Sequence, residues 1–384
     1  MLWNRIIYAM IAVSSVTAFI LTDSSAALYL CVCVLALPAV SFLMLFFAAK
    51  KVKFDYDIGS SCIRGGSLPI TFRAEISPRF LAGAVIAVVE TENTTFHKTE
   101  KKRFLFRDLS FAPHTYDYVS SDSGRITVKI KTIKITDIFG VCSLRVKCGK
   151  VAEASVSPVL YEDVSVAMGV KNSGSFSGET SLPEKGYDHS ELFNVRDYAA
   201  GDSLNSIHWK LTAKFDGLKV KEFGSTDDHK TLILADLSRE KNGERATDAQ
   251  LNSVLDVTVS VSEALKTQGY AHTVGWFVDG TFCGCEVSDS NSFVQMVSSL
   301  MSNKVDAKNA ESLFYLLRSA ECAAFTKIVF VSPSVWGSEL KDCSSLDVTA
   351  VAVGYKDGEL DEENYKIINM PCGEIGAALS NCVL

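Results

Sequence analysis

Residues 186–214 hold the densest set of side chains in this chain that could do acid–base chemistry. His208 or His189 could act as a general base, and three carboxylates could join it in one cleft: Asp197, Asp202 and Asp236. A hydrolase of this kind needs a nucleophile, a base and an orienting group within hydrogen-bond reach. The chain has neither a Gly-x-Ser-x-Gly elbow nor a His-Glu-x-x-His pair, so the spacing identifies no reaction. His208 beside Trp209 is more typical of a packed histidine.

A second set of candidate residues follows the short apolar run Thr231–Ala235. Asp236, Ser238 and Glu240 place oxygen donors at alternating positions of one turn. Hard cations such as magnesium prefer compact oxygen ligands of these types. Two interpretations stay open: a magnesium site, or a polar remnant that only caps a helix. No other cofactor is expected.

The local sequence places much of the first set on a short helix. Gly201 breaks the chain, and Asp202 can accept N–H bonds from the first helical turn. The residues after it then fall on one face of the helix: Leu204, Ile207, His208 and Leu211. Lys210 lies near the C-terminal end, where a cation opposes the helix dipole. The same pattern fits a capped helix that docks Trp209 into a core.

The order and spacing of these residues resemble the signature of the bacterial family catalogued as domain of unknown function 58. The matching residues are Glu191, Phe193, Arg196, Tyr198, Gly201, Asp202, Ile207, Trp209, Lys210, Ala213 and Lys214. Upstream, residues 137–140 resemble the family's Asp-Pro-Phe-Gly turn, and downstream a basic strand-like run covers residues 217–223. The chain departs from the pattern at Ile138, where proline is usual, and at Asn205, where arginine is common. The missing guanidinium at position 205 argues against an anion clamp on this helix. Arg196 is expected to pair with Asp197, Asp202 or Glu191 rather than with a substrate phosphate.

The N-terminal region predicts a transmembrane helical hairpin over residues 1–49. Two apolar runs, Ile6–Leu21 and Ala26–Ala49, are separated by four residues, and about 20 apolar residues suffice to cross a bilayer. Arg5 precedes the first run and lysines follow the second, whereas the turn carries only Asp23. By the positive-inside rule both ends face the cytoplasm, so a multi-pass protein of the cell membrane with a cytoplasmic soluble part is expected. The alternative is a signal peptide cleaved after Ser24-Ser-Ala26.

Composition argues against a role in nucleic-acid binding. Residues 1–49 carry no net charge, so the formal charge of −7 belongs to residues 50–384. Affinity for nucleic acid comes from basic surface, which an acidic soluble part does not supply. Nine of the 11 cysteines lie in that part at irregular spacing, which favours reduced thiols over a disulfide framework. Cys283 and Cys285 alone give only a weak zinc signal.

Three segments follow the anchor. Residues 50–160 alternate between apolar and polar positions and predict an antiparallel β-sandwich. Residues 161–229 are expected to form a surface loop followed by the signature segment. Residues 230–384 alternate strands with helices and predict a Rossmann-like α/β domain. Strands are expected at residues 231–235, 271–278, 327–331 and 348–353. One helix is expected to begin after Thr247, with Gln250 placed for a capping box, and to stop at Gly269. Its apolar stripe consists of Leu251, Val254, Leu255, Thr258, Val261 and Leu265.

This last segment resembles the von Willebrand A fold, whose Asp-x-Ser-x-Ser loop holds a divalent cation after the first strand. Asp236 and Ser238 match that loop, and Glu240 replaces its final serine. Ser332-Pro-Ser334 stands where the family's later aspartate is expected. The resemblance therefore implies a degenerate metal site.

The favoured interpretation is a non-enzymatic, membrane-anchored interaction or scaffold module on the cytoplasmic face. Members of the resembled family often occur beside MoxR-type AAA ATPases, which implies such an ATPase as the partner in envelope-related or complex-assembly processes. Two alternatives remain: a hydrolase that uses His208 with nearby carboxylates, and a metal-dependent adhesion module facing outside.

Overall fold

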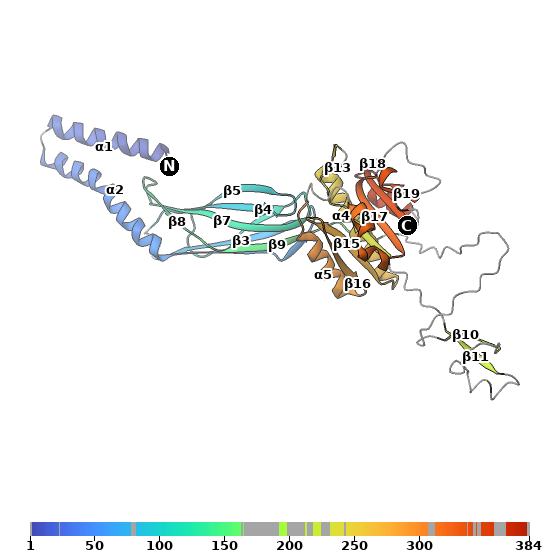
Figure 1. Cartoon of the computed structure of the whole chain (residues 1–384). Helices are drawn as coiled ribbons and strands as arrows, with labels where there is room; N and C mark the ends of the chain where they lie inside the picture. Colours follow the sequence, from blue (N-terminus) through green and yellow to red (C-terminus); the bar gives the residue numbers. More distant parts are fainter. Residues whose placement is uncertain are drawn as a thin grey trace. The chain divides into compact units, whose positions relative to one another are not determined.

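Two apolar helices begin the chain in the computed structural model (Figure 1). They are α1 (Leu2–Thr22) and α2 (Ser25–Lys51), and both are long and apolar enough to cross a membrane. Figure 1 shows them as a hairpin, and the Tyr8 hydroxyl of α1 donates to the Val34 carbonyl of α2 at 2.7 Å.

The structure describes residues 2–22, 24–77, 82–162, 164, 192–197, 212, 218–223, 231–241, 243–305, 312–335, 337–340, 343, 347–356 and 366–381. The contacts divide the chain into two compact units: Met1–Val166 together with Thr231–Leu384, and Ala167–Lys230.

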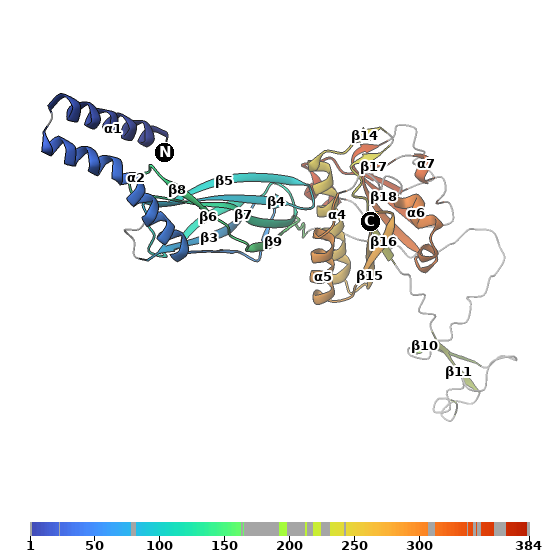
Figure 2. The same ribbon diagram turned by 60° about the vertical axis from the view of Figure 1, so that its left-hand side comes forward.

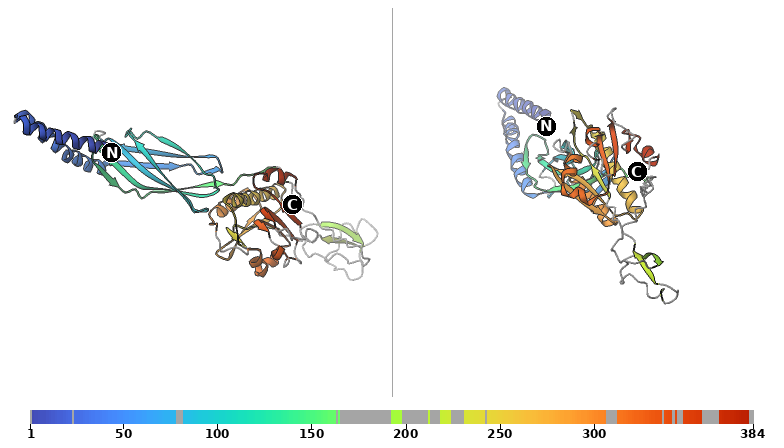
Figure 3. Two further views of the ribbon diagram at one scale, coloured as in Figure 1. Left: turned by 90° about the horizontal axis from the view of Figure 1, so that it is seen from above. Right: turned by 45° about the vertical axis from the view of Figure 1, so that its right-hand side comes forward.

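The segment after α2 is built from two sheets. The first sheet contains β1 (Val52–Ile58), β3 (Ser67–Ile76) and β6 (His114–Val119). The second sheet runs in the order β2 (Ser61–Ile63), β9 (Val151–Ser157), β7 (Gly124–Thr136), β4 (Ala84–Asn93) and β5 (Lys98–Phe106), and β8 (Ser143–Val146) pairs with β7. The strand pairs are antiparallel except β2 with β9, which is parallel, so the predicted purely antiparallel pattern fails at that pair. Figure 3 shows the long strands from above.

Alternation along these strands explains their shared core. β3 and β4 bury every second side chain, as half-buried strands do. Tyr56, Phe72 and Ile126 are fully or almost fully buried in this core. Leu45 and Ala48 of α2 belong to the same core, so the second helix is packed onto the two-sheet segment rather than joined to it by a linker.

The unit Ala167–Lys230 contains a small antiparallel pair. β10 (Leu192–Asp197) pairs with β11 (Lys219–Phe223), and Arg196 lies opposite Val220. The strand expected within residues 217–223 is therefore present over Lys219–Phe223.

A six-stranded sheet forms the centre of the C-terminal α/β segment. Its order is β16 (Thr281–Val287), β15 (His272–Val278), β12 (Thr231–Ala235), β17 (Lys327–Val335), β18 (Asp347–Lys356) and β19 (Lys366–Asn369). Neighbours are parallel except β16, which forms an antiparallel edge with β15. A short hairpin follows β12 and consists of two strands of two residues each, β13 (Glu240–Lys241) and β14 (Glu244–Arg245).

Helices cover both faces of this sheet (Figure 2). α4 (Asp248–Thr267) and α5 (Ser290–Met301) lie on one face, and α6 (Ser312–Arg318) and α7 (Gly337–Leu340) on the other. The described residues also contain a 3₁₀ turn at Ala320–Ala324 and α8 (Ile375–Asn381). α4 begins at Thr247 with the expected capping box to Gln250, and Gly269 follows its end with φ of 83°.

Candidate functional site

The candidate site lies where β12 and β17 end side by side. Taken in chain order, the strands of the α/β sheet lie in the order 3-2-1-4-5-6, so its topological switch point falls between β12 and β17. Ligands of open α/β sheets bind beyond the carboxyl ends of the strands at this point. Asp236 follows β12 there, and its backbone N–H donates to the Val331 carbonyl of β17 at 2.8 Å.

Asp236 is 1% exposed, and hydrogen bonds engage both of its carboxylate oxygens. Oδ1 accepts from the backbone N–H of Ser238 at 3.1 Å and also from the Ser238 hydroxyl. Oδ2 lies 2.9 Å from the Ser332 hydroxyl and 3.0 Å from the Lys241 ammonium. A buried carboxylate needs such partners because burial otherwise disfavours its charge.

The Lys241 ammonium is the cation of this cluster. Its side chain is 5% exposed and contacts Asp236 and, at 2.8 Å, Glu339. It also donates to the Ser334 carbonyl at 3.4 Å and lies 5.1 Å from the centre of the Phe330 ring. Burial alone would lower the pKa of Lys241, but the charges of Asp236 and Glu339 outweigh burial and raise it. Lys241 therefore stays protonated.

The structure brings together two of the three residues predicted to bind metal. Asp236 and Ser238 are bonded to each other, whereas Glu240 is exposed on β13. Neighbouring side chains of a strand point to opposite faces, so the hairpin that buries Lys241 turns Glu240 outward. Among the described residues, no group of three or more His, Cys, Asp or Glu side chains could hold a metal ion.

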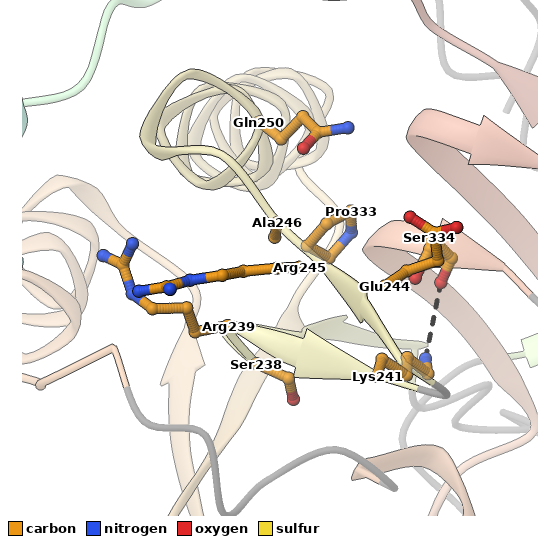
Figure 4. A pocket seen from close by; sticks show the side chains of 9 residues that line it. All are labelled: Ser238, Arg239, Lys241, Glu244, Arg245, Ala246, Gln250, Pro333 and Ser334. Atoms are coloured by element: carbon orange, nitrogen blue, oxygen red, sulfur yellow. Dashed lines mark hydrogen bonds between the residues drawn. The ribbon is translucent and has the colours of Figure 1, made fainter.

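A small pocket of about 30 Å³ adjoins this cluster (Figure 4). It is lined by Ser238, Arg239, Lys241, Glu244, Arg245, Ala246, Gln250, Pro333 and Ser334. In Figure 4 the two arginine side chains extend to one side, away from Lys241. Arg239 forms an ion pair with Asp248 of α4 at 2.8 Å. The pocket therefore connects the cluster to the start of α4.

Sequence reasoning missed a polar stripe along α4. Asp248, Asn252, Asp256 and Ser260 are spaced four residues apart and share one helix face, opposite the predicted apolar stripe. Leu251 to Ser262 are all buried, so both faces of this helix are covered. The four-residue spacing was visible in the sequence and could have identified the stripe.

The polar stripe contacts the two-sheet segment. Asp256 accepts from Arg64 at 2.5 Å and from the Val159 N–H at 2.9 Å, and Asn252 donates to Asp122 at 2.9 Å. Desolvation by burial raises the pKa of Asp256 despite the opposing charge of Arg64. Buried polar groups of this kind are costly unless they are paired, so these contacts specify how α4 packs.

Lys98 of β5 extends the network toward the pocket. Its ammonium lies 2.5 Å from Asp122 and 2.7 Å from Asp248, which also pairs with Arg239. Burial alone would raise the pKa of Asp248, but Lys98 and Arg239 lower it below its ordinary value. One carboxylate thus links a side chain of the two-sheet segment to a side chain of the pocket.

Most of the predicted signature lies outside the described residues. This holds for Glu191, Tyr198, Gly201, Asp202, His208, Trp209 and Lys210, and for His189. Arg196 and Asp197 lie on β10, where only the backbone is described. Whether these residues meet in one site stays a prediction.

The fold defines a class of protein with two N-terminal apolar helices, a two-sheet segment and an α/β segment. The candidate site of this class lies at the switch point of the α/β sheet, where Lys241 is buried among Asp236, Ser332 and Glu339. Residues 194–311 match the model of a family described as "Protein of unknown function DUF58". The match confirms the family resemblance drawn from the signature, and it spans β10 to α5, including Asp236 and Lys241. No curated protein matches the chain.

Proposed function

We propose that this protein is a membrane-anchored interaction or scaffold module whose soluble part lies in the cytoplasm. The observation that carries the proposal is the single compact unit formed by Met1–Val166 and Thr231–Leu384. Its α/β segment is fixed to the two-sheet segment by buried pairs, and the two-sheet segment is packed on α2. A scaffold needs such rigid support for a binding surface.

The proposal includes a finer assignment of the two soluble segments. We assign residues 50–160 to the β-sandwiches and residues 230–384 to the von Willebrand A class. The two sheets that share one core support the first assignment. The order of the parallel sheet, its antiparallel edge strand and the position of Asp236 after the first strand support the second.

The proposed partner is a MoxR-type AAA ATPase, as the family resemblance implies. Neither fold nor family fixes a function, so the partner needs a direct test. The full chain, purified from native membranes in mild detergent, should retain such an ATPase, and the yield should change when ATP is added or removed. An unrelated two-span membrane protein serves as the control bait. Repeated recovery of no ATPase beyond the control would contradict the proposal.

The two alternatives receive no support from the described residues. The hydrolase needs His208 or His189, which lie outside the described part, and Asp236 is bonded to Lys241. The adhesion module needs a divalent cation where Lys241 places its ammonium.

A further inference from the structure

The donors around Asp236 are those of a hard-cation site. The Asp236 carboxylate and the hydroxyls of Ser238 and Ser332 converge from the ends of two neighbouring strands. Oxygen ligands of this kind bind magnesium or manganese in proteins. The cation beside these oxygens is the Lys241 ammonium, a side chain of the protein itself.

We propose that Lys241 is the built-in cation of this site and that its ammonium takes the place of a divalent metal ion. Its Nζ lies 3.0 Å from Asp236 Oδ2, 2.8 Å from Glu339 Oε1 and 3.4 Å from Ser332 Oγ. Magnesium would have to approach the same oxygens at about 2.0–2.1 Å, within the space that the ammonium fills. The ammonium also repels a second cation.

The β13–β14 hairpin explains how the chain delivers this ammonium. Gly243 has φ of 83°, which permits the tight turn between the two short strands. Neighbouring side chains of β13 point in opposite directions, so Lys241 points inward and Glu240 outward. Lys241 therefore occupies the place beside Asp236 where Glu240 was expected as a metal ligand. The Phe330 ring beneath the ammonium favours a fixed cation there.

A resident ammonium changes how the site can be used. A metal ion binds and dissociates according to its concentration, whereas the Lys241 ammonium is covalently attached to the chain. Any binding at the neighbouring pocket should therefore be independent of divalent cations and unaffected by the chelator EDTA. This inference stands on the Asp236 cluster and does not depend on the identity of the partner.

The test is a manganese titration of the metal-stripped full chain in detergent, followed by electron paramagnetic resonance of the free ion. The wild type and Asp236→Asn should show the same weak background. Lys241→Ala vacates the ammonium's place and should gain one saturable site at submillimolar manganese. The double variant Asp236→Asn/Lys241→Ala should lose that site.

Two results would overturn the inference. The first is a saturable site in the wild type that Asp236→Asn removes. The second is a folded Lys241→Ala variant, verified by circular dichroism, that gains no site. If Lys241→Ala does not fold, Lys241→Gln replaces it as the variant without a charge. With either variant, the comparison of the wild type with Asp236→Asn still shows whether the wild type binds a metal ion at Asp236.

Discussion

His272 is a buried neutral histidine, and its two ring nitrogens have different partners. Nδ1 lies 3.0 Å from the Tyr270 carbonyl, which can only accept, so Nδ1 carries the proton. Nε2 then accepts from the Ser262 hydroxyl at 2.7 Å. Burial lowers the pKa of His272 below its ordinary value of 6.5, despite the carbonyl contact that raises it. Protonation of this side chain therefore costs folding free energy.

The pH dependence of stability follows from that lowered pKa. Above the unfolded pKa of about 6.5 the histidine is neutral in both states, and below it the unfolded chain gains a proton that the folded chain resists. The free energy of unfolding should fall as the pH drops from about 7 to about 5, and His272→Gln should flatten that part of the curve. Denaturant unfolding at several pH values measures the free energy of unfolding for the wild type and for the variant. The exposed His114→Gln is the control, and an equal flattening there would refute the assignment.

The sharpest stability prediction concerns the buried Arg64–Asp256 ion pair. Asp256→Ala leaves a guanidinium whose side chain is only 18% exposed without its partner. Removing one member of a buried pair costs about 3–5 kcal/mol of unfolding free energy. Glu75→Ala breaks the exposed pair with Lys53, where a loss of about 0–1 kcal/mol is expected. Equal losses in the two variants would contradict the burial argument.

Helix α4 shows which elements sequence can predict. Its cap, its apolar stripe and its stop at Gly269 depend on residues close in the chain, and all were predicted. The β13–β14 hairpin was missed because two-residue strands show no periodicity. The position of Lys241 depends on contacts with Ser332 and Glu339, about 90 residues away or more, so local pattern could not reveal it.

The cap of α4 gives a local test. The Thr247 hydroxyl accepts from the Gln250 N–H at 3.2 Å, which satisfies one of the unpaired donors of the first turn. Thr247→Ala should lower the unfolding free energy by about 1 kcal/mol, whereas Thr247→Ser should retain most of it. Hydrogen exchange of the first turn of α4 would locate the effect. Unchanged exchange in Thr247→Ala would show that the cap contributes nothing.

The turn at residues 137–140 lies against the start of α1. Asn4 and Arg5 donate to the carbonyls of Phe139 and Val141 at 2.8 and 2.9 Å. Ile138 is 57% exposed and Phe139 54% exposed, although both are apolar. If α1 spans the bilayer, these two side chains lie at the level of the lipid headgroups.

A photoreactive phenylalanine analogue at position 139 tests this location. In vesicles or native membranes, illumination should yield lipid adducts at Phe139, detected by mass spectrometry. The same analogue at Tyr315 of α6, which is 45% exposed, serves as the control and should yield none. Equal yields at the two positions would place the turn away from the bilayer.

At the scale of the whole molecule, the two N-terminal apolar helices were the easiest part to predict. The helices extend past the predicted runs, to Leu2–Thr22 and Ser25–Lys51, because hydropathy marks only the apolar part of a helix. The α/β alternation also predicted β12, β15, β17 and β18 of the sheet, but not its edge strands β16 and β19. The parallel β2–β9 pair and the contact between α4 and the two-sheet segment could not be predicted, because both join residues distant in the sequence.

Reporter fusions test the membrane topology. Arg5, Lys50 and Lys51 flank the helices, so the positive-inside rule places both ends of the chain in the cytoplasm. A C-terminal green fluorescent protein should fluoresce, and a C-terminal alkaline phosphatase should be inactive. Moving the phosphatase to the turn at Ser24 is the matched control and should make it active. The opposite pattern would favour the outward-facing adhesion alternative.

From Leu251 to Ser262, helix α4 has no face left for solvent, and this has a consequence for evolution. A gene fragment that encodes only the α/β segment would produce a helix with one side shaped for an absent neighbour. We therefore expect recombination to preserve the two-sheet and α/β segments as one heritable block. Within that block, substitutions at position 64 should be matched by substitutions at position 256.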